Sequence, residues 1–238
     1  MRLKYCKKPV VAAPSGMALG GGCEVVLTSG FVRAHGETYI GLVELGAGLI
    51  PAGGGCKNLI LNAEALLKEK GPQGWFGKTD GGPMAKVNKC FEAIGFAKVA
   101  TSALEGVACG YIPKSTCKLT LSRDRLIYDA KQDVLELSKN WNPGNPREDI
   151  LMAGQGGMTA LFAAIENFQL QGKISAHDAL IARQLSKVLT AGHLPNMGYV
   201  SEQDLLDLER EAFLSLIAEE KTQARMQSLV MTGKPLRN

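Results

Sequence analysis

Residues 8–24, KPVVAAPSGMALGGGCE, decide the fold. A short β-branched run after a charged lead-in is typical of a buried strand, and the glycine-rich stretch 15–22 that follows predicts a turn. Residues 23–30 carry no helix breaker until Gly30, which suits the left-handed position after a helix, so we expect a helix there. The same order then repeats, with strands at 31–34 and 38–43, a glycine-bearing loop at 44–55 and a helix at 57–68. Strand, glycine turn and helix in repetition predict an α/β fold.

The composition is that of an ordinary globular chain. Of its 238 residues, 45% are hydrophobic and 21% are charged, which is enough to bury a core. The net charge of +4 is mild and scattered, so we expect no nucleic-acid partner. No apolar run is long enough for a membrane span, and the start of the chain does not resemble a signal peptide. We therefore expect a cytoplasmic protein.

The six cysteines are expected to be reduced thiols, because no secretion signal accompanies them and the chain is too large to need disulfides. None of them stands in C-x-x-C spacing and the three histidines are far apart, so we expect no metal site. No G-x-G-x-x-G fingerprint is present, which argues against a dinucleotide site in this chain.

Helices dominate the second half of the sequence. We expect an α/β part at residues 1–115, with a loop insertion near 70–84 where five glycines and two prolines gather, and a helical region at 116–238. Ser175-x-x-Asp178 and Ser201-x-x-Asp204 fit N-terminal capping signals. Helices are expected at 87–99, 101–110, 122–140, 157–171, 176–191 and 202–232.

The run Gly20–Gly22, at the entry of the first helix, is the first candidate site. Unpaired backbone N–H groups at the positive end of a helix dipole can hold an oxyanion, and glycine leaves no side chain to block close approach. A carbonyl oxygen that becomes enolate-like could accept a hydrogen bond from the Gly21 N–H. The same glycines could serve only the close packing of helix against strand, and the run alone does not decide between the two.

Glu24 and Glu44 are the candidate acid–base pair. Glu24 lies in the first turn of the same helix and Glu44 at the end of the following strand, so we expect both to point near one site. Two carboxylates beside an oxyanion-binding N–H suit proton removal and delivery next to a carbonyl. Taken singly, Glu24 could be a first-turn glutamate that the helix dipole favours, and Glu44 could be a solvated strand end.

Two stretches together resemble a known family, the enoyl-CoA hydratase/isomerase (crotonase) superfamily. They are residues 8–24 and residues 41–55, GLVELGAGLIPAGGG, and their separation also fits the family. The resemblance implies a partial crotonase-like ββα spiral core followed by an α-helical C-terminal region. It also implies that the substrate is an acyl-CoA thioester.

The resemblance further implies a role for each candidate residue. Gly21 matches the glycine whose N–H polarises the thioester carbonyl, Glu24 the glutamate that activates the attacking water, and Glu44 the one that exchanges a proton with the α-carbon. The pair would hydrate trans-2-enoyl-CoA to 3-hydroxyacyl-CoA, with no cofactor and no metal. The residues expected to contact the substrate besides these are Leu19, Gly20, Gly22 and Pro51.

The sequence departs from the family at its front. Crotonases build their first strands, much of the CoA-binding surface and a second oxyanion-hole N–H from residues that would precede Met1. The ending, GKPLRN at 233–238, resembles the C-terminus of bacterial fatty-acid oxidation proteins in which a 3-hydroxyacyl-CoA dehydrogenase precedes a crotonase-like part. We therefore expect the C-terminal portion of such a protein, lacking the N-terminal part of the crotonase domain, as a homo-oligomer or joined to a dehydrogenase part. The alternative is a truncated, non-catalytic part that serves assembly or acyl-CoA binding in a dehydrogenase complex.

Overall fold

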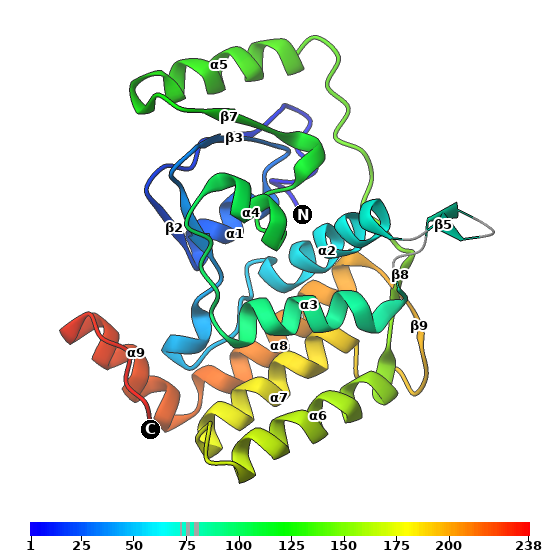
Figure 1. Cartoon of the computed structure of the whole chain (residues 1–238), viewed down its shortest axis with the longest axis vertical. Coiled ribbons are helices and arrows are strands. Elements are labelled where there is room, and N and C mark those ends of the chain that lie inside the picture. The colour runs from blue at the N-terminus through cyan, green and yellow to red at the C-terminus, as the bar shows by residue number, and fades with distance from the viewer. Residues whose placement is uncertain (72, 75–76, 79–80) are drawn as a thin grey trace.

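The computed structural model describes residues 1–71, 73–74, 77–78 and 81–238 (Figure 1). The parallel strands lie at one end of the molecule and a stack of helices at the other, with α2 (Gly55–Lys70) and α3 (Pro83–Gly95) between them. The α/β fold that the sequence predicts is confirmed.

Two β-β-α units follow one another and stack in parallel. The first unit comprises β1 (Val11–Ala12), β2 (Met17–Leu19) and α1 (Gly21–Thr28). The second comprises β3 (Phe31–His35), β4 (Tyr39–Gly41), the 3-10 turn η1 (Glu44–Ala47) and α2. β1 pairs with β3 and β2 pairs with β4, both in parallel. Each strand of the second unit therefore lies beside the matching strand of the first unit. This is the ββα spiral that the resemblance implies.

The sheet continues beyond α3. An isolated bridge between Ile40 and Ala100 precedes α4 (Ala103–Cys109), and β7 (Cys117–Thr120) then joins β3 to give the order β1-β3-β7. α5 (Leu126–Leu137) returns along the outside of this sheet (Figure 1). The short 3-10 turns η2 (Lys114–Thr116) and η3 (Arg123–Arg125) flank β7.

The stretch 70–84 contains a small hairpin. β5 (Gln73–Gly74) pairs antiparallel with β6 (Gly77–Lys78). The sequence predicts a loop insertion here, and residues 72, 75–76 and 79–80 of it lie outside the described residues.

The second half of the chain packs as a stack of helices. α7 lies between α6 and α8 and also contacts α3, which joins the stack to the spiral (Figure 1). A two-stranded antiparallel pair, β8 with β9, closes one side. The elements are β8 (Ile150–Met152), α6 (Gly154–Leu170), α7 (Ala176–Thr190), β9 (Gly198–Val200), α8 (Glu202–Ile217) and α9 (Glu220–Thr232).

Both predicted capping signals are confirmed. Ser175 and Ser201 are the N-caps of α7 and α8, and each forms a reciprocal capping box with the aspartate three residues later. The single helix predicted over 202–232 is wrong, because the chain breaks at 218–219 between α8 and α9.

The break between α8 and α9 has a packing reason. It turns α9 so that two polar side chains are buried against earlier elements. Thr222 Oγ1 donates to the Gly48 carbonyl at 3.0 Å, and Arg225 Nη1 lies 2.8 Å from Asp178 Oδ1. If α8 and α9 formed one straight helix, Thr222 and Arg225 would not reach these partners.

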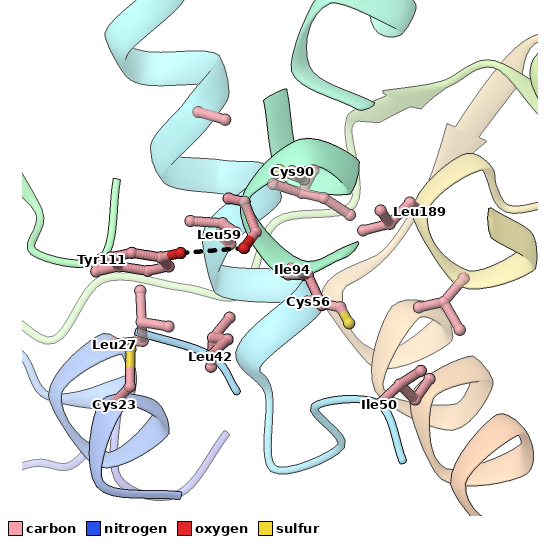
Figure 2. Close-up of a cluster of buried hydrophobic side chains, with 14 of the residues drawn as sticks. Cys23, Leu27, Leu42, Ile50, Cys56, Leu59, Cys90, Ile94, Tyr111 and Leu189 are labelled. Carbon is pink, nitrogen blue, oxygen red and sulfur yellow. Dashed lines mark hydrogen bonds between the residues drawn. The ribbon is translucent and has the colours of Figure 1, made fainter. Parts of the chain in front are cut away.

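One hydrophobic cluster runs from α1 to α8. Figure 2 shows its centre, where α1, α2, α3 and α7 meet and contribute Cys23, Leu27, Cys56, Leu59, Cys90, Ile94 and Leu189. Tyr111 is fully buried there, and its hydroxyl donates to the Lys98 carbonyl at 2.7 Å. The division into residues 1–115 and 116–238 stays a prediction, and the two parts share this core.

The buried carboxylate of Glu202 links the N-terminal residues to the helical region by hydrogen bonds. Glu202 of α8 accepts hydrogen bonds from Lys57 Nζ at 2.5 Å, from Lys4 Nζ at 3.1 Å and from the Tyr5 hydroxyl. Burial alone would raise the pKa of Glu202, but the hydrogen bonds from Lys57 and Tyr5 and the lysine charges lower it to about 2. The side chain is therefore ionised over the whole neutral range.

The six cysteines are free, and four of them are buried. In the described part of the chain, no three His, Cys, Asp or Glu side chains lie together in a way that could hold a metal ion. None of the described helices is both long enough and apolar enough to cross a bilayer.

Candidate functional site

The glycine run forms the entry of α1. Gly20 is the N-cap with φ +56°, its N–H donates to the Gly41 carbonyl at 2.9 Å, and its own carbonyl accepts from the Glu24 N–H at 3.0 Å. Gly21 and Gly22 occupy the first turn and are exposed, and a Cβ added to either would meet nothing within 4 Å. First-turn N–H groups have no acceptor inside their own helix, so these two can serve an external acceptor. The run therefore presents open backbone donors.

Glu24 reaches from α1 to the entry of α2. Its Oε1 accepts hydrogen bonds from the Gly53 N–H at 2.7 Å and from the Gly55 N–H at 2.9 Å. Burial raises the pKa of Glu24, and these two N–H groups offset part of the rise. A Cβ at Gly53 would lie 2.6 Å from Oε2 and one at Gly55 would lie 2.8 Å from Oε1, so only glycine lets the carboxylate approach this closely.

Glu44 opens η1 and points back to the glycine run. A Cβ at Gly20 would lie 3.4 Å from Glu44 Oε1. Both carboxylate oxygens are buried, and neither has a hydrogen-bond partner among the residues that the structure describes. Burial, with a smaller contribution from the charge of Glu24, raises the pKa of Glu44 to about 7, although the nearby N–H groups of Glu44 and Val43 counter it. A carboxyl group with this pKa can exchange a proton near neutral pH.

The structure brings Gly20–Gly22, Glu24 and Glu44 into one region, as the sequence predicts. Leu19 ends β2 opposite Gly41, directly before the glycine run, and is half-buried. Pro51 is buried under the entry of α2, where its carbonyl accepts from Cys56 Sγ at 3.3 Å. The roles of all these residues in binding or catalysis stay predictions.

Glu209 of α8 is a third carboxylate that the sequence reasoning missed. It is fully buried, its Oε2 accepts from the Gly54 N–H at 2.8 Å, and its Oε1 accepts from the Lys57 N–H at 2.6 Å. Burial raises the pKa of Glu209 to about 8, and these N–H groups lower it only in part. The sequence does carry a signal that Glu209 is buried. It lies on the apolar stripe of α8, four residues from Leu205 and three from Ala212.

The arrangement joins two chemical capacities. The open N–H groups of α1 can stabilise negative charge that develops on an oxygen. Beside them, two carboxyl groups with raised pKa values can take up and release protons, and neither oxygen of Glu44 has a hydrogen-bond partner among the described residues. Together these capacities suit proton transfer at a carbon next to a carbonyl group.

Part of this chain is similar to a known enzyme family. Residues 1–63 match the family model of enoyl-CoA hydratase/isomerase. A probable 3-hydroxyacyl-CoA dehydrogenase of Bacillus subtilis (strain 168) is 43% identical over 239 residues, which cover 100% of this chain and 28% of that protein. A 2,3-dehydroadipyl-CoA hydratase of Escherichia coli (strain K12) is 39% identical over 69 residues, which cover 29% of this chain and 27% of that protein. The chain thus spans 28% and 27% of the lengths of these two relatives.

A solved structure extends the likeness to the fold of the whole chain. The carnitinyl-CoA hydratase from Mycobacterium avium aligns with a TM-score of 0.51 over 96% of this chain and 62% of that chain, at 18% sequence identity. The shared α/β fold thus extends over nearly the whole chain, whereas the match to the enoyl-CoA hydratase/isomerase family model covers residues 1–63.

Proposed function

We propose that this chain carries the residues for hydration of a trans-2-enoyl-CoA to a 3-hydroxyacyl-CoA. The observation that carries the proposal is the meeting of two carboxyl groups of raised pKa at the open glycine end of α1. In this reaction a water oxygen bonds to the β-carbon, the C=C electrons move toward the thioester, and a proton reaches the α-carbon.

Each residue has a defined part in the proposed step. Both hydrogen bonds to Glu24 fall on Oε1, and Oε2 has no partner within the described chain, so Oε2 is the base that takes the proton from water. The Gly21 N–H holds the thioester oxygen as it becomes negative, a contribution of about 3 kcal/mol for one well-placed donor. Glu44 begins protonated and gives its proton to the α-carbon, which a pKa near 7 permits at neutral pH. The sum adds one water. Glu24 then releases the proton it took to solvent and Glu44 takes one up, which restores both groups, and the step needs no oxidant, metal or cofactor.

A dehydrogenase is the partner that fits this chemistry. Hydration yields a 3-hydroxyacyl thioester, and the Bacillus subtilis relative, which is similar along the entire chain, is named for a dehydrogenase of 3-hydroxyacyl-CoA. The proposal therefore includes a dehydrogenase part in the same protein or in a complex with it. A homo-oligomer is the other arrangement that we infer for the natural protein.

The test is the hydration of crotonyl-CoA, followed by the loss of enoyl absorbance. It is run on this chain and on a longer protein that contains it. Glu24→Gln and Glu44→Gln should each lower kcat by about 100-fold or more, the upper range for loss of a general acid or base. Glu37→Gln is the matched control, because Glu37 is exposed on the loop before β4, and it should leave kcat unchanged.

Gly21 offers a sharper variant for ligand binding. A Cβ at Gly21 meets no protein atom within 4 Å, so Gly21→Val should fold normally, and its side chain should cover the N–H that the thioester needs. Loss of both acyl-CoA binding and hydration in Gly21→Val supports the proposal. Saturable acyl-CoA binding without hydration in the longer protein would instead support a non-catalytic, acyl-CoA-binding part.

A further inference from the structure

Two carboxylates from distant parts of the chain share one helix entry. Among the residues that begin α2, the N–H groups of Gly53 and Gly55 donate to Glu24, and those of Gly54 and Lys57 donate to Glu209. The two sets alternate along the chain, so the donors of one carboxyl group are close chain neighbours of the donors of the other. We call residues 53–57 the α2 entry.

The backbone of the α2 entry depends on this arrangement. Gly54 has φ +100°, a conformation that side chains rarely adopt, and its carbonyl accepts from the Asn58 side-chain amide at 2.8 Å. Leu206 of α8 lies against the same glycine, 3.6 Å from the position of a Cβ. One face of α8 therefore holds the middle of the entry by packing and by hydrogen bonds.

We propose that Glu209 is a positioning residue for Glu24, through the hydrogen bonds that it accepts from Gly54 and Lys57. By holding these two N–H groups, Glu209 sets the direction of the intervening Gly53 and Gly55 N–H groups, which orient the Glu24 carboxylate. This inference rests on the proposed function, because the orientation of Glu24 matters for catalysis only if Glu24 Oε2 is the base in the proposed step. The helical region is thus part of the site and not only a scaffold.

The first experiment measures hydrogen exchange of single backbone amides by NMR. Both oxygens of Glu209 accept a backbone hydrogen bond, and Glu209→Gln keeps the size of the side chain but replaces one of these oxygens with an amide nitrogen that cannot accept one in any protonation state. It should raise the exchange rates of Gly53 and Gly55, which do not contact Glu209, by about tenfold, a coupling of ordinary size between sites. Glu211→Gln, an exposed glutamate on the same helix, is the control and should leave both rates unchanged.

A cap that only stabilises α2 would give a different pattern. In that case Glu209→Gln would speed exchange at Gly54 and Lys57 alone and would leave Gly53 and Gly55 at the wild-type rates, which would overturn the inference. The reciprocal variant, Glu24→Gln, retains Glu209 and covers the case in which Glu209 variants do not fold. Because coupling is reciprocal, it should raise exchange at Gly54 and Lys57 by a similar factor of about ten, and unchanged rates there would also overturn the inference.

Kinetics separate this inference from the proposed function. In a longer protein that hydrates crotonyl-CoA, Glu209→Gln should lower kcat by about tenfold with little change in KM, because it misplaces the base and not the CoA contacts. If the amide exchange rates are coupled but the longer protein hydrates no crotonyl-CoA, the proposed function is wrong and the positioning role of Glu209 stands. Hydration with uncoupled amides would remove the positioning role and leave the proposed function.

Discussion

Two neighbouring glycines of the same run differ in what they require. Gly20 has φ +56° and lies against Glu44, whereas Gly21 has ordinary helical geometry and open space around it. Gly20→Ala should therefore lower the free energy of unfolding by about 1–3 kcal/mol, because alanine rarely adopts φ +56° with ψ −123°. Gly21→Ala should leave it unchanged or raise it by up to about 1 kcal/mol, because it reduces the freedom of the unfolded chain. Urea unfolding of both variants checks this, and equal effects would contradict it.

At the level of single residues, the sequence predicts the local part of the site and misses the distant part. Glu24 and Glu44 could be placed together because each sits next to a glycine turn in one of two successive units. Glu209 lies 155 residues beyond Gly54, and no rule of spacing connects them. Only its position on an apolar stripe indicates that it is buried, and that signal does not name its partner.

Among the elements, α5 is attached to the sheet by a buried ion pair as well as by apolar contact. Its outward residues Ile127, Tyr128 and Leu135 are exposed, while Asp133 is buried and paired with Arg33 of β3 through two hydrogen bonds of 2.6 Å. Asp133→Asn leaves the guanidinium half-paired and should lower the free energy of unfolding by about 3 kcal/mol, as breaking a buried pair does.

Denaturant unfolding with a helix probe measures the effect of Asp133→Asn. Glu136→Gln is the control. Glu136 lies on α5 and pairs with Lys118 of β7, but its side chain is mostly exposed, so the substitution should change the free energy of unfolding by less than about 0.5 kcal/mol. Similar effects of the two substitutions would show that the Arg33 pair does not anchor α5.

Element prediction succeeds where a local signal exists. The helix starts at Ser175 and Ser201 carry capping boxes and were predictable. β2 has only three residues within a glycine-rich stretch, too few for an alternating pattern, and it forms because β4 offers a parallel partner. The break at 218–219 has no glycine or proline, and tertiary partners of Thr222 and Arg225 decide it.

For the whole molecule, buried carboxyl groups make stability depend on pH in two opposite ways. Glu64 and Glu202 have pKa values lowered to about 2 by their lysine and arginine partners against the effect of burial, so their contribution is present above about pH 4.5 and is lost as the pH falls. Glu44 and Glu209 have pKa values raised to about 7 and about 8 by burial. Above pH 4.5, the pKa of a glutamate in the unfolded chain, the folded chain still binds these two protons and the unfolded chain does not. The contribution of these two groups to the free energy of unfolding therefore falls as the pH rises from about 4.5 to about 8.

Glu44→Gln isolates the candidate site from the rest of this pH dependence. Glutamine resembles the protonated carboxyl, so wild type and variant should unfold at similar denaturant concentrations at pH 5. At pH 8 the variant should be more stable by on the order of 1–3 kcal/mol, because it never has to hold a buried negative charge. Glu37→Gln should show no such change with pH, and a Glu44→Gln variant that is no more stable at pH 8 than at pH 5, relative to wild type, would contradict the assignment. A carboxyl group that weakens the fold at neutral pH and has no hydrogen-bond partner for either oxygen within the described chain gains nothing structural from being a glutamate, which is the pattern expected of the proton-exchanging group that we propose.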